Sequence, residues 1–87
     1  MNTRRSELQI IGEILEMSKE GAKTTQLLYR CNLGYSQLKN YVSFLIEKDI
    51  LQVKRIKNGG GYNKIYAITD KGNDLLVNIQ KTFSYLK

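Results

Sequence analysis

The chain has 87 residues, of which 41% are hydrophobic, 25% are charged and none is proline. A chain of this length forms one small domain whose core alone gives marginal stability. With one cysteine and no histidine, an internal disulfide is excluded, and neither a metal site nor a cofactor is expected. Association with a second copy is therefore the remaining way to bury more surface.

The net charge of +6 is concentrated in the middle of the chain. Residues 21–64 carry eight basic and two acidic side chains, a net of +6, whereas residues 1–20 carry −1 and residues 65–87 carry +1. This excess indicates an anionic partner, either nucleic acid or a membrane surface, although a run of charge is also typical of an ordinary solvated face. Charges interrupt every apolar run well before the ~18 residues of a membrane span, and no secretory signal is recognisable.

The first predicted element is an amphipathic helix over residues 6–19. Thr3 or Ser6 is expected to supply its N-cap, and Gly21 lies just beyond its end. Its apolar residues form two stripes, one of Leu8, Ile11 and Leu15 and the other of Ile10, Ile14 and Met17. We therefore expect this helix to pack on two sides.

Two further helices are predicted around a short turn. Residues 24–31 form the first, and the second runs from the N-cap Ser36 to about residue 48, with Leu38, Val42 and Leu45 facing inward. Between them, Gly34 suits a positive φ. Two short helices joined in this way are typical of a helix-turn-helix, although other helical hairpins share the spacing.

A β-hairpin is predicted directly after these helices. Residues 51–56 and 65–68 are rich in β-branched and aromatic residues. The segment between them, residues 57–64, contains Asn58-Gly59 and three consecutive glycines, which predicts a flexible hairpin tip. A helix-turn-helix followed by a two-stranded hairpin is the winged-helix arrangement, so the predicted fold class is mostly α with a small β-hairpin.

The last predicted helix begins after the N-cap Thr69 and runs to the C-terminus. Its apolar residues follow heptad spacing at Leu76, Ile79, Phe83 and Leu86. Such a short seam is also common in packing within one chain. However, about 18 helical residues extend ~27 Å, which is longer than the small winged domain can cover. We therefore divide the chain into a winged helix-turn-helix over residues 1–69 and a homodimerising helix over residues 70–87.

Polar residues at three places are candidates for contact with duplex DNA. In a helix-turn-helix the second helix enters the major groove, and a wing follows the backbone or the minor groove. On the recognition helix the candidates are Ser36, Gln37, Lys39, Asn40 and Ser43. On the wing they are Lys54, Arg55, Lys57, Asn58, Tyr62, Asn63 and Lys64. Further phosphate contacts are expected from Arg4, Arg5, Thr24, Thr25 and Arg30. The alternative is that these residues form a plain solvated face.

Four of the six tyrosines and the cysteine are expected to pack in the interior. Tyr29, Tyr35, Tyr41 and Tyr66 are interpreted as core or inter-helix residues, and only Tyr62 is placed on an exposed tip. Cys31 is interpreted as a small buried hydrophobe.

Several segments resemble the small archaeal winged-helix DNA-binding proteins that carry a C-terminal dimerising helix. The similar segments are Arg4-Arg5-Ser6-Glu7, Ser36-Gln37-Leu38-Lys39 with Tyr41 and Phe44-Leu45, and Tyr66-Ala67-Ile68-Thr69-Asp70-Lys71-Gly72. The resemblance covers nearly the full chain and implies dimeric, chromosomal or regulatory DNA binding. The C-terminal helix is shorter here than the coiled-coil arm of that family.

The leading hypothesis is therefore a homodimer that binds double-stranded DNA in the cytoplasm, associated with the nucleoid, as a transcription regulator or a chromosome-organising protein. The alternative is a protein-interaction module that uses the stripe of Ile10, Ile14 and Met17 together with the last helix. An enzyme is not expected, because the chain lacks histidine, a phosphate-binding glycine motif and a nucleophile with a partner base.

Overall fold

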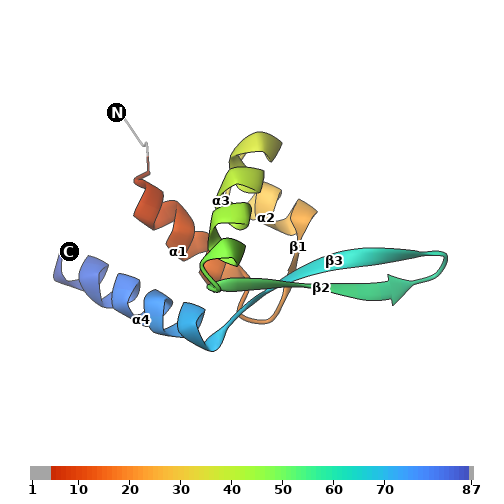
Figure 1. Ribbon diagram of the computed structural model, residues 1–87. Coiled ribbons are helices and arrows are strands. Elements are labelled where there is room, and N and C mark those ends of the chain that lie inside the picture. The colour runs from red at the N-terminus through yellow and green to blue at the C-terminus, as the bar shows by residue number, and fades with distance from the viewer. Residues whose placement is uncertain (1–4, 87) are drawn as a thin grey trace.

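The computed structural model describes residues 5–86, which form four helices and a three-stranded antiparallel sheet (Figure 1). The helices are α1 (Glu7–Met17), α2 (Thr24–Arg30), α3 (Tyr35–Glu47) and α4 (Asp70–Tyr85). The strands are β1 (Ala22–Lys23), β2 (Leu51–Asn58) and β3 (Gly61–Ile68). The predicted order of three helices, a hairpin and a last helix is confirmed.

Strand β1 is an addition to the predicted hairpin. Ala22 and Lys23 pair with Tyr66 and Ile65, so the sheet has the order β1-β3-β2. Two residues between two helices show no alternating pattern, and only pairing with a strand distant in sequence makes them a strand. The preceding Gly21 has a φ of +87°, a conformation that favours glycine. Strand β1 thereby ties the start of α2 to the base of the hairpin.

The hairpin, which we call the wing, is longer than predicted. Strands β2 and β3 pair continuously from Leu51 opposite Ile68 to Asn58 opposite Gly61. The expected eight-residue tip is therefore wrong, and the turn consists of Gly59 and Gly60, with Gly59 at a φ of +62°. Each added pair satisfies backbone hydrogen-bonding groups, which outweighs the weak strand propensity of lysine and asparagine. The wing projects well beyond the helices (Figure 1).

The predicted N-cap of α1 is confirmed, whereas the predicted N-cap of α3 is wrong. At α1, the Ser6 hydroxyl accepts from the backbone N–H of Gln9 at 3.1 Å, and the Gln9 side chain accepts from the N–H of Ser6 at 2.8 Å. At α3 the N-cap is Gly34, not Ser36. The Gln37 side chain accepts from the N–H of Gly34 at 3.0 Å, so the helix begins two residues earlier than a serine cap implies.

The turn between α2 and α3 also differs from the prediction. Gly34 has a φ of −75°, and the positive φ of +54° belongs to Asn32. Asparagine tolerates the left-handed conformation better than most residues with a side chain. The hydroxyl of Ser36 is consequently free of a capping role.

A single core joins all four helices to the base of the sheet. Its apolar members are Ile14, Leu15, Ala22, Leu27, Cys31, Leu38, Val42, Leu45, Ile50, Leu51, Leu76 and Ile79. Ile14 and Leu15 come from both predicted stripes of α1 and are fully buried, so packing on two sides is confirmed. Burial raises the pKa of the Cys31 thiol, the charge of Glu13 raises it further, and Arg5 opposes the shift. Cys31 is thus the buried hydrophobe that was predicted.

Two sets of residues lie where they were not expected. Leu76 and Ile79, assigned to a dimer seam, are buried within this chain, where α4 packs along α1. Of the predicted seam, Phe83 is half-buried and Leu86 is exposed. Tyr29 and Tyr35, assigned to the interior, are 88% and 65% exposed. Apolar spacing identifies the inner face of a helix but does not identify which chain covers it.

The start of α4 is hydrogen-bonded to the turn that follows α3. The Thr69 hydroxyl donates to the carbonyls of Asp49 (2.7 Å) and Ile50 (3.0 Å) and accepts from the N–H of Gly72 (2.9 Å). Lys71 Nζ donates to the carbonyl of Lys48 at 2.9 Å, at the end of α3. We call this set of contacts the α3–α4 clamp. It explains the Thr69-Asp70-Lys71-Gly72 motif: Thr69 caps α4, as predicted, and also fixes the end of the preceding helix.

The clamp requires glycine at position 72. A Cβ on Gly72 would lie 2.2 Å from the carbonyl oxygen of Ile50 and 2.7 Å from a side-chain carbon of Ile68. We expect Gly72→Ala to lower the free energy of unfolding by about 2 kcal/mol or more, although alanine is the better helix former by up to ~1 kcal/mol. Thermal unfolding measures the loss as a fall of about 10 °C or more.

Gly60→Ala is the matched control, because a Cβ on Gly60 meets no atom within 4 Å. Its melting temperature should stay close to that of the wild type, within about 0.5 kcal/mol of stability. Equal melting temperatures for the two variants would contradict the steric role of Gly72.

Candidate nucleic-acid interface

Helix α3 presents a polar, exposed side between two hollows. The five predicted recognition residues, Ser36, Gln37, Lys39, Asn40 and Ser43, are all exposed. Lys39 and Ser43 line a cleft between α3 and the wing. Gln37 and Asn40 line a second hollow on the other side of α3, together with Glu7 and Phe44. No neighbouring element covers this polar side of α3, as insertion into a groove requires.

The cleft between α3 and the wing, called the wing cleft below, combines apolar and basic side chains. Its lining comprises Thr24, Tyr35, Leu38, Lys39, Val42, Ser43, Ile46, Val53, Lys64 and Tyr66. No acidic side chain is among them. Within residues 5–86 the ion pairs involve only Arg5 and Lys19 as cations, so the charges of Lys39 and Lys64 are not neutralised by the part of the protein described.

Strand register sorts the wing residues onto two faces. Residues directly opposite each other in an antiparallel pair share a face, and successive residues alternate. Arg55 is opposite Lys64, and Lys57 is opposite Tyr62. These four residues share the face of Val53 and Tyr66, which line the wing cleft. Three of the wing cations thus lie on the side of the wing that faces α3.

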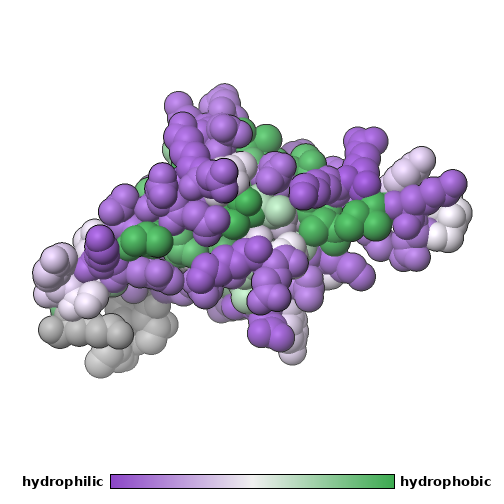
Figure 2. Space-filling model, turned by 90° about the horizontal axis from the view of Figure 1, so that it is seen from below, coloured by the Kyte–Doolittle hydropathy of each residue, from purple (hydrophilic) through white to green (hydrophobic). Residues whose placement is uncertain are grey.

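The other face of the wing is less basic, with Lys54 as its one cation. Lys54, Asn58 and Asn63 lie there with Ile56, which is 51% exposed, and Ile65. A hydrophobic area is visible on the wing inward of its tip when the molecule is seen from below (Figure 2). The seven predicted wing residues therefore do not act as one surface, and Lys54 is separated from Arg55 despite being its neighbour in sequence.

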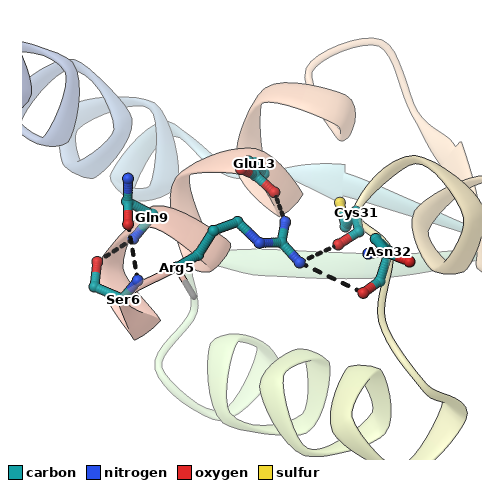
Figure 3. A network of polar contacts seen from close by, with 6 residues as sticks. All are labelled: Arg5, Ser6, Gln9, Glu13, Cys31 and Asn32. Atoms are coloured by element: carbon teal, nitrogen blue, oxygen red, sulfur yellow. Dashed lines mark hydrogen bonds and ion pairs between the residues drawn. The ribbon is translucent and has the colours of Figure 1, made fainter. Parts of the chain in front are cut away.

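The expected phosphate contacts lie in different surroundings. Thr24 is half-buried at the wing cleft, and Thr25 and Arg30 are exposed on α2. Arg4 lies outside the described residues. Arg5 is used internally: it pairs with Glu13 and donates to the backbone carbonyls of Cys31 (2.5 Å) and Asn32 (3.4 Å) (Figure 3).

The network around Arg5 gives its side chain a role inside the protein, which was not predicted. Its guanidinium bridges α1 and the turn of the helix-turn-helix, so its donors point into the protein (Figure 3). When a basic residue precedes an amphipathic helix, the sequence does not show whether its side chain binds an acceptor within the protein or a phosphate of DNA. Arg5 instead holds the positive-φ turn at Asn32 that orients α3.

Two aromatic residues at this surface were not among the predicted contacts. Tyr35 is the first residue of α3 and lines the wing cleft. Phe44 is 48% exposed beside Asn40 in the second hollow, and Lys48 Nζ lies 5.9 Å from the centre of its ring. Tyr35 was expected in the interior, and Phe44 was given no role. An exposed aromatic ring on α3 could have been recognised from helical spacing for Phe44, which falls outside the stripe of Leu38, Val42 and Leu45.

Candidate metal ligands and membrane-spanning helices were both sought in the part of the chain that the structure describes. Residues 5–86 contain no group of three or more cysteine, aspartate or glutamate side chains placed to hold a metal ion. None of the helices described is long and apolar enough to cross a bilayer.

Comparison with known proteins identifies the architecture. An uncharacterized protein of Methanocaldococcus jannaschii is 26% identical over 84 residues, 95% of this chain and 78% of that protein. The crystal structure of Sso10a-2, a DNA-binding protein from Sulfolobus solfataricus, matches with a TM-score of 0.79 at 26% identity, covering 93% of this chain and 81% of that one. A PadR family transcription regulator from Clostridium difficile has the same fold, with a TM-score of 0.81 at 14% identity over 88% of each chain. The sequence also matches the winged helix-turn-helix family over residues 4–87. The chain therefore belongs to the winged helix-turn-helix family.

Proposed function

We propose that the protein is a homodimer that binds double-stranded DNA, as a transcription regulator or a chromosome-organising protein. The observation that carries this proposal is the basic side shared by α3 and the wing. Arg55, Lys57 and Lys64 lie on the wing face toward α3, and Lys39 and Lys64 line the wing cleft, whose lining has no acidic residue. The phosphate backbone supplies most of the affinity of such a surface. The similarity to Sso10a-2, which is a DNA-binding protein, supports the same partner.

The side chains of α3 suit the edges of bases in the major groove. Gln37 and Asn40 can each form two hydrogen bonds with adenine N6 and N7, and Lys39 can reach guanine or a phosphate. Ser36 and Ser43 are exposed hydroxyls that suit either a base or a phosphate. In this arrangement the wing lies along the backbone next to the occupied groove, with Arg55 and Lys64 toward the phosphates.

Homodimerisation rests on the outer end of α4. The core takes up Leu76 and Ile79, but Leu86 is 74% exposed and Phe83 only half-buried. Phe83 and Leu86 line a groove between α1 and α4 together with Gly12. A small domain gains stability by covering such apolar surface with a second copy.

The competing function, a protein-interaction module, was assigned two surfaces, the second stripe of α1 and the last helix, and the first of these is not exposed. Ile14 is fully buried, and Ile10 and Met17 pack against the core. The stripe is therefore interior to this domain, and an exposed docking face on α1 is not supported.

The first prediction from the proposed function concerns the salt dependence of duplex binding. If six to ten phosphates are contacted, affinity for random duplex should fall by about 10³- to 10⁵-fold between 50 and 200 mM salt. Fluorescence anisotropy with labelled duplex measures this slope. Tight binding that is insensitive to salt would contradict the proposal. A ratio above about 10³ between genomic fragments and random duplex would identify a regulator, and a ratio near one a chromosome-organising protein.

The second prediction compares two adjacent wing residues that receive the same change of charge. Arg55→Glu should weaken duplex binding at least about tenfold and lower the salt slope by roughly one per chain, because Arg55 lies on the face toward α3. Lys54→Glu, on the opposite face, should weaken binding much less. An equal loss in both variants would show that net charge alone matters and would contradict the proposed orientation of the wing.

The third prediction concerns the dimer. Analytical ultracentrifugation of the wild type should give twice the chain mass of 10.0 kDa. The double change Phe83→Ser and Leu86→Ser should shift the protein to the monomer, because both side chains belong to the proposed interface. Ile56→Ser, which removes an exposed apolar side chain from the wing, should leave the dimer intact. A monomeric wild type at high micromolar concentration would contradict dimerisation.

A further inference from the structure

The wing cleft has an apolar floor that phosphate contacts alone do not require. Leu38 and Val42 form its buried base, and Ile46 and Val53 are 36% and 42% exposed. The ring of Tyr66 lines the floor between α3 and the wing, and the exposed ring of Tyr35 lies at one end of α3. Apolar surface of this kind gains free energy when an apolar group covers it.

The rest of the lining of the same cleft is basic and rich in hydroxyl groups. Lys39 projects from α3 and Lys64 from β3, and Ser43 and Thr24 add hydroxyls. The cleft has a volume of about 360 Å³, which lies within the range of small-molecule sites. Its chemistry therefore suits a ligand with an apolar body and one anionic group.

Two other hollows of the described surface lack this combination. The groove between α1 and α4 is apolar but lined by Glu13 and Glu16, which would repel an anion. The hollow between α1 and α3 contains Glu7 and no cation. Of the three, only the wing cleft places cations beside apolar surface without a carboxylate.

We propose that the wing cleft binds a small aromatic carboxylate. Its ring would cover Val53 and Tyr66, and its carboxylate would lie between Lys39 and Lys64. Because the proposed DNA surface uses the same two lysines, ligand and duplex would compete for the cleft. This regulatory part rests on the proposed function, whereas the binding of the ligand does not.

Binding is tested on the protein alone, with 1-naphthoate as the probe. In a ¹H–¹⁵N correlation spectrum, naphthoate should shift the amide signals of the cleft, among them Lys39, Ser43 and Val53. Val53→Ser should weaken its affinity about fivefold, because part of the apolar floor is lost. Val77→Ser, at a similarly exposed valine on α4 (49%), should leave the affinity unchanged.

Three results would overturn the site: no shift at millimolar naphthoate, shifts confined to the groove between α1 and α4, or equal loss of affinity in both valine variants. The spectrum of each variant reports its folding directly. Should Val53→Ser unfold, Lys64→Gln replaces it, since Lys64 is exposed and its change removes an anchoring charge. Unchanged naphthoate affinity in Lys64→Gln would likewise overturn the site.

Competition is tested with labelled duplex and the wild-type protein. Naphthoate at ten times its dissociation constant should weaken duplex binding about elevenfold by mass action. Sodium acetate at the same concentration controls for ionic strength, because it carries the charge without the ring. Equal effects of the two salts would overturn competition. Absence of duplex binding without any ligand would instead refute the proposed function, and the spectral titration would still decide whether the cleft binds naphthoate.

Discussion

The geometry of the protein depends on the α3–α4 clamp, where three elements meet within a few residues. Helix α3 is followed by the backbone carbonyls of Lys48, Asp49 and Ile50, which accept hydrogen bonds from the side chains of Lys71 and Thr69. Strand β2 starts directly after these carbonyls at Leu51, and α4 starts at Asp70. The backbone N–H of Thr69 also donates to the Ile50 carbonyl at 3.1 Å. Because each of these contacts ends on a backbone carbonyl between α3 and β2, they fix the relative directions of α3, the wing and α4. A Cβ at Gly72 would push the three apart.

A second junction holds the wing from the other side. The N–H of Ile68, at the end of β3, donates to the carbonyl of Ser18 at 3.1 Å, and β1 pairs with β3 just beyond it. Ser18 itself is fully buried, with its hydroxyl donating to the Ile14 carbonyl at 2.7 Å. The base of the wing is thus bound to α1 as well as to α3, whereas its outer half is paired only within the hairpin. The wing cleft lies at the supported end, so its walls are held at a set distance while the tip is left free to follow a partner.

Local chemistry made part of this structure predictable. The caps at Ser6 and Thr69 and the inner face of α3 depend on neighbours within four residues, and each was found from the sequence. Several wrong predictions concern contacts between distant segments: β1 exists only through β3, and Arg5 has carbonyl acceptors 26 and 27 residues away. The cap of α3 is a local exception, because Gln37 accepts from the N–H of Gly34 three residues away, and Gly34 rather than Ser36 is the N-cap. The same holds for the candidate site. Its basic residues could be identified from the sequence, but which of them share a face of the wing follows from the strand register.

Helix α4 links the core to the proposed dimer. Its first half belongs to the core through Leu76 and Ile79, where Gly12 allows α1 to approach: a Cβ there would lie 3.2 Å from Ile79. The exposed apolar side chain of Leu86 and the half-buried Phe83 belong to its second half, so the proposed dimer contact is at the end of α4 remote from the clamp. Two recognition helices that enter successive major grooves on one side of DNA must be about 34 Å apart. In the proposed dimer that separation is set by α4 as a rigid spacer, and a change at the clamp would alter duplex affinity without touching any residue that is proposed to contact DNA.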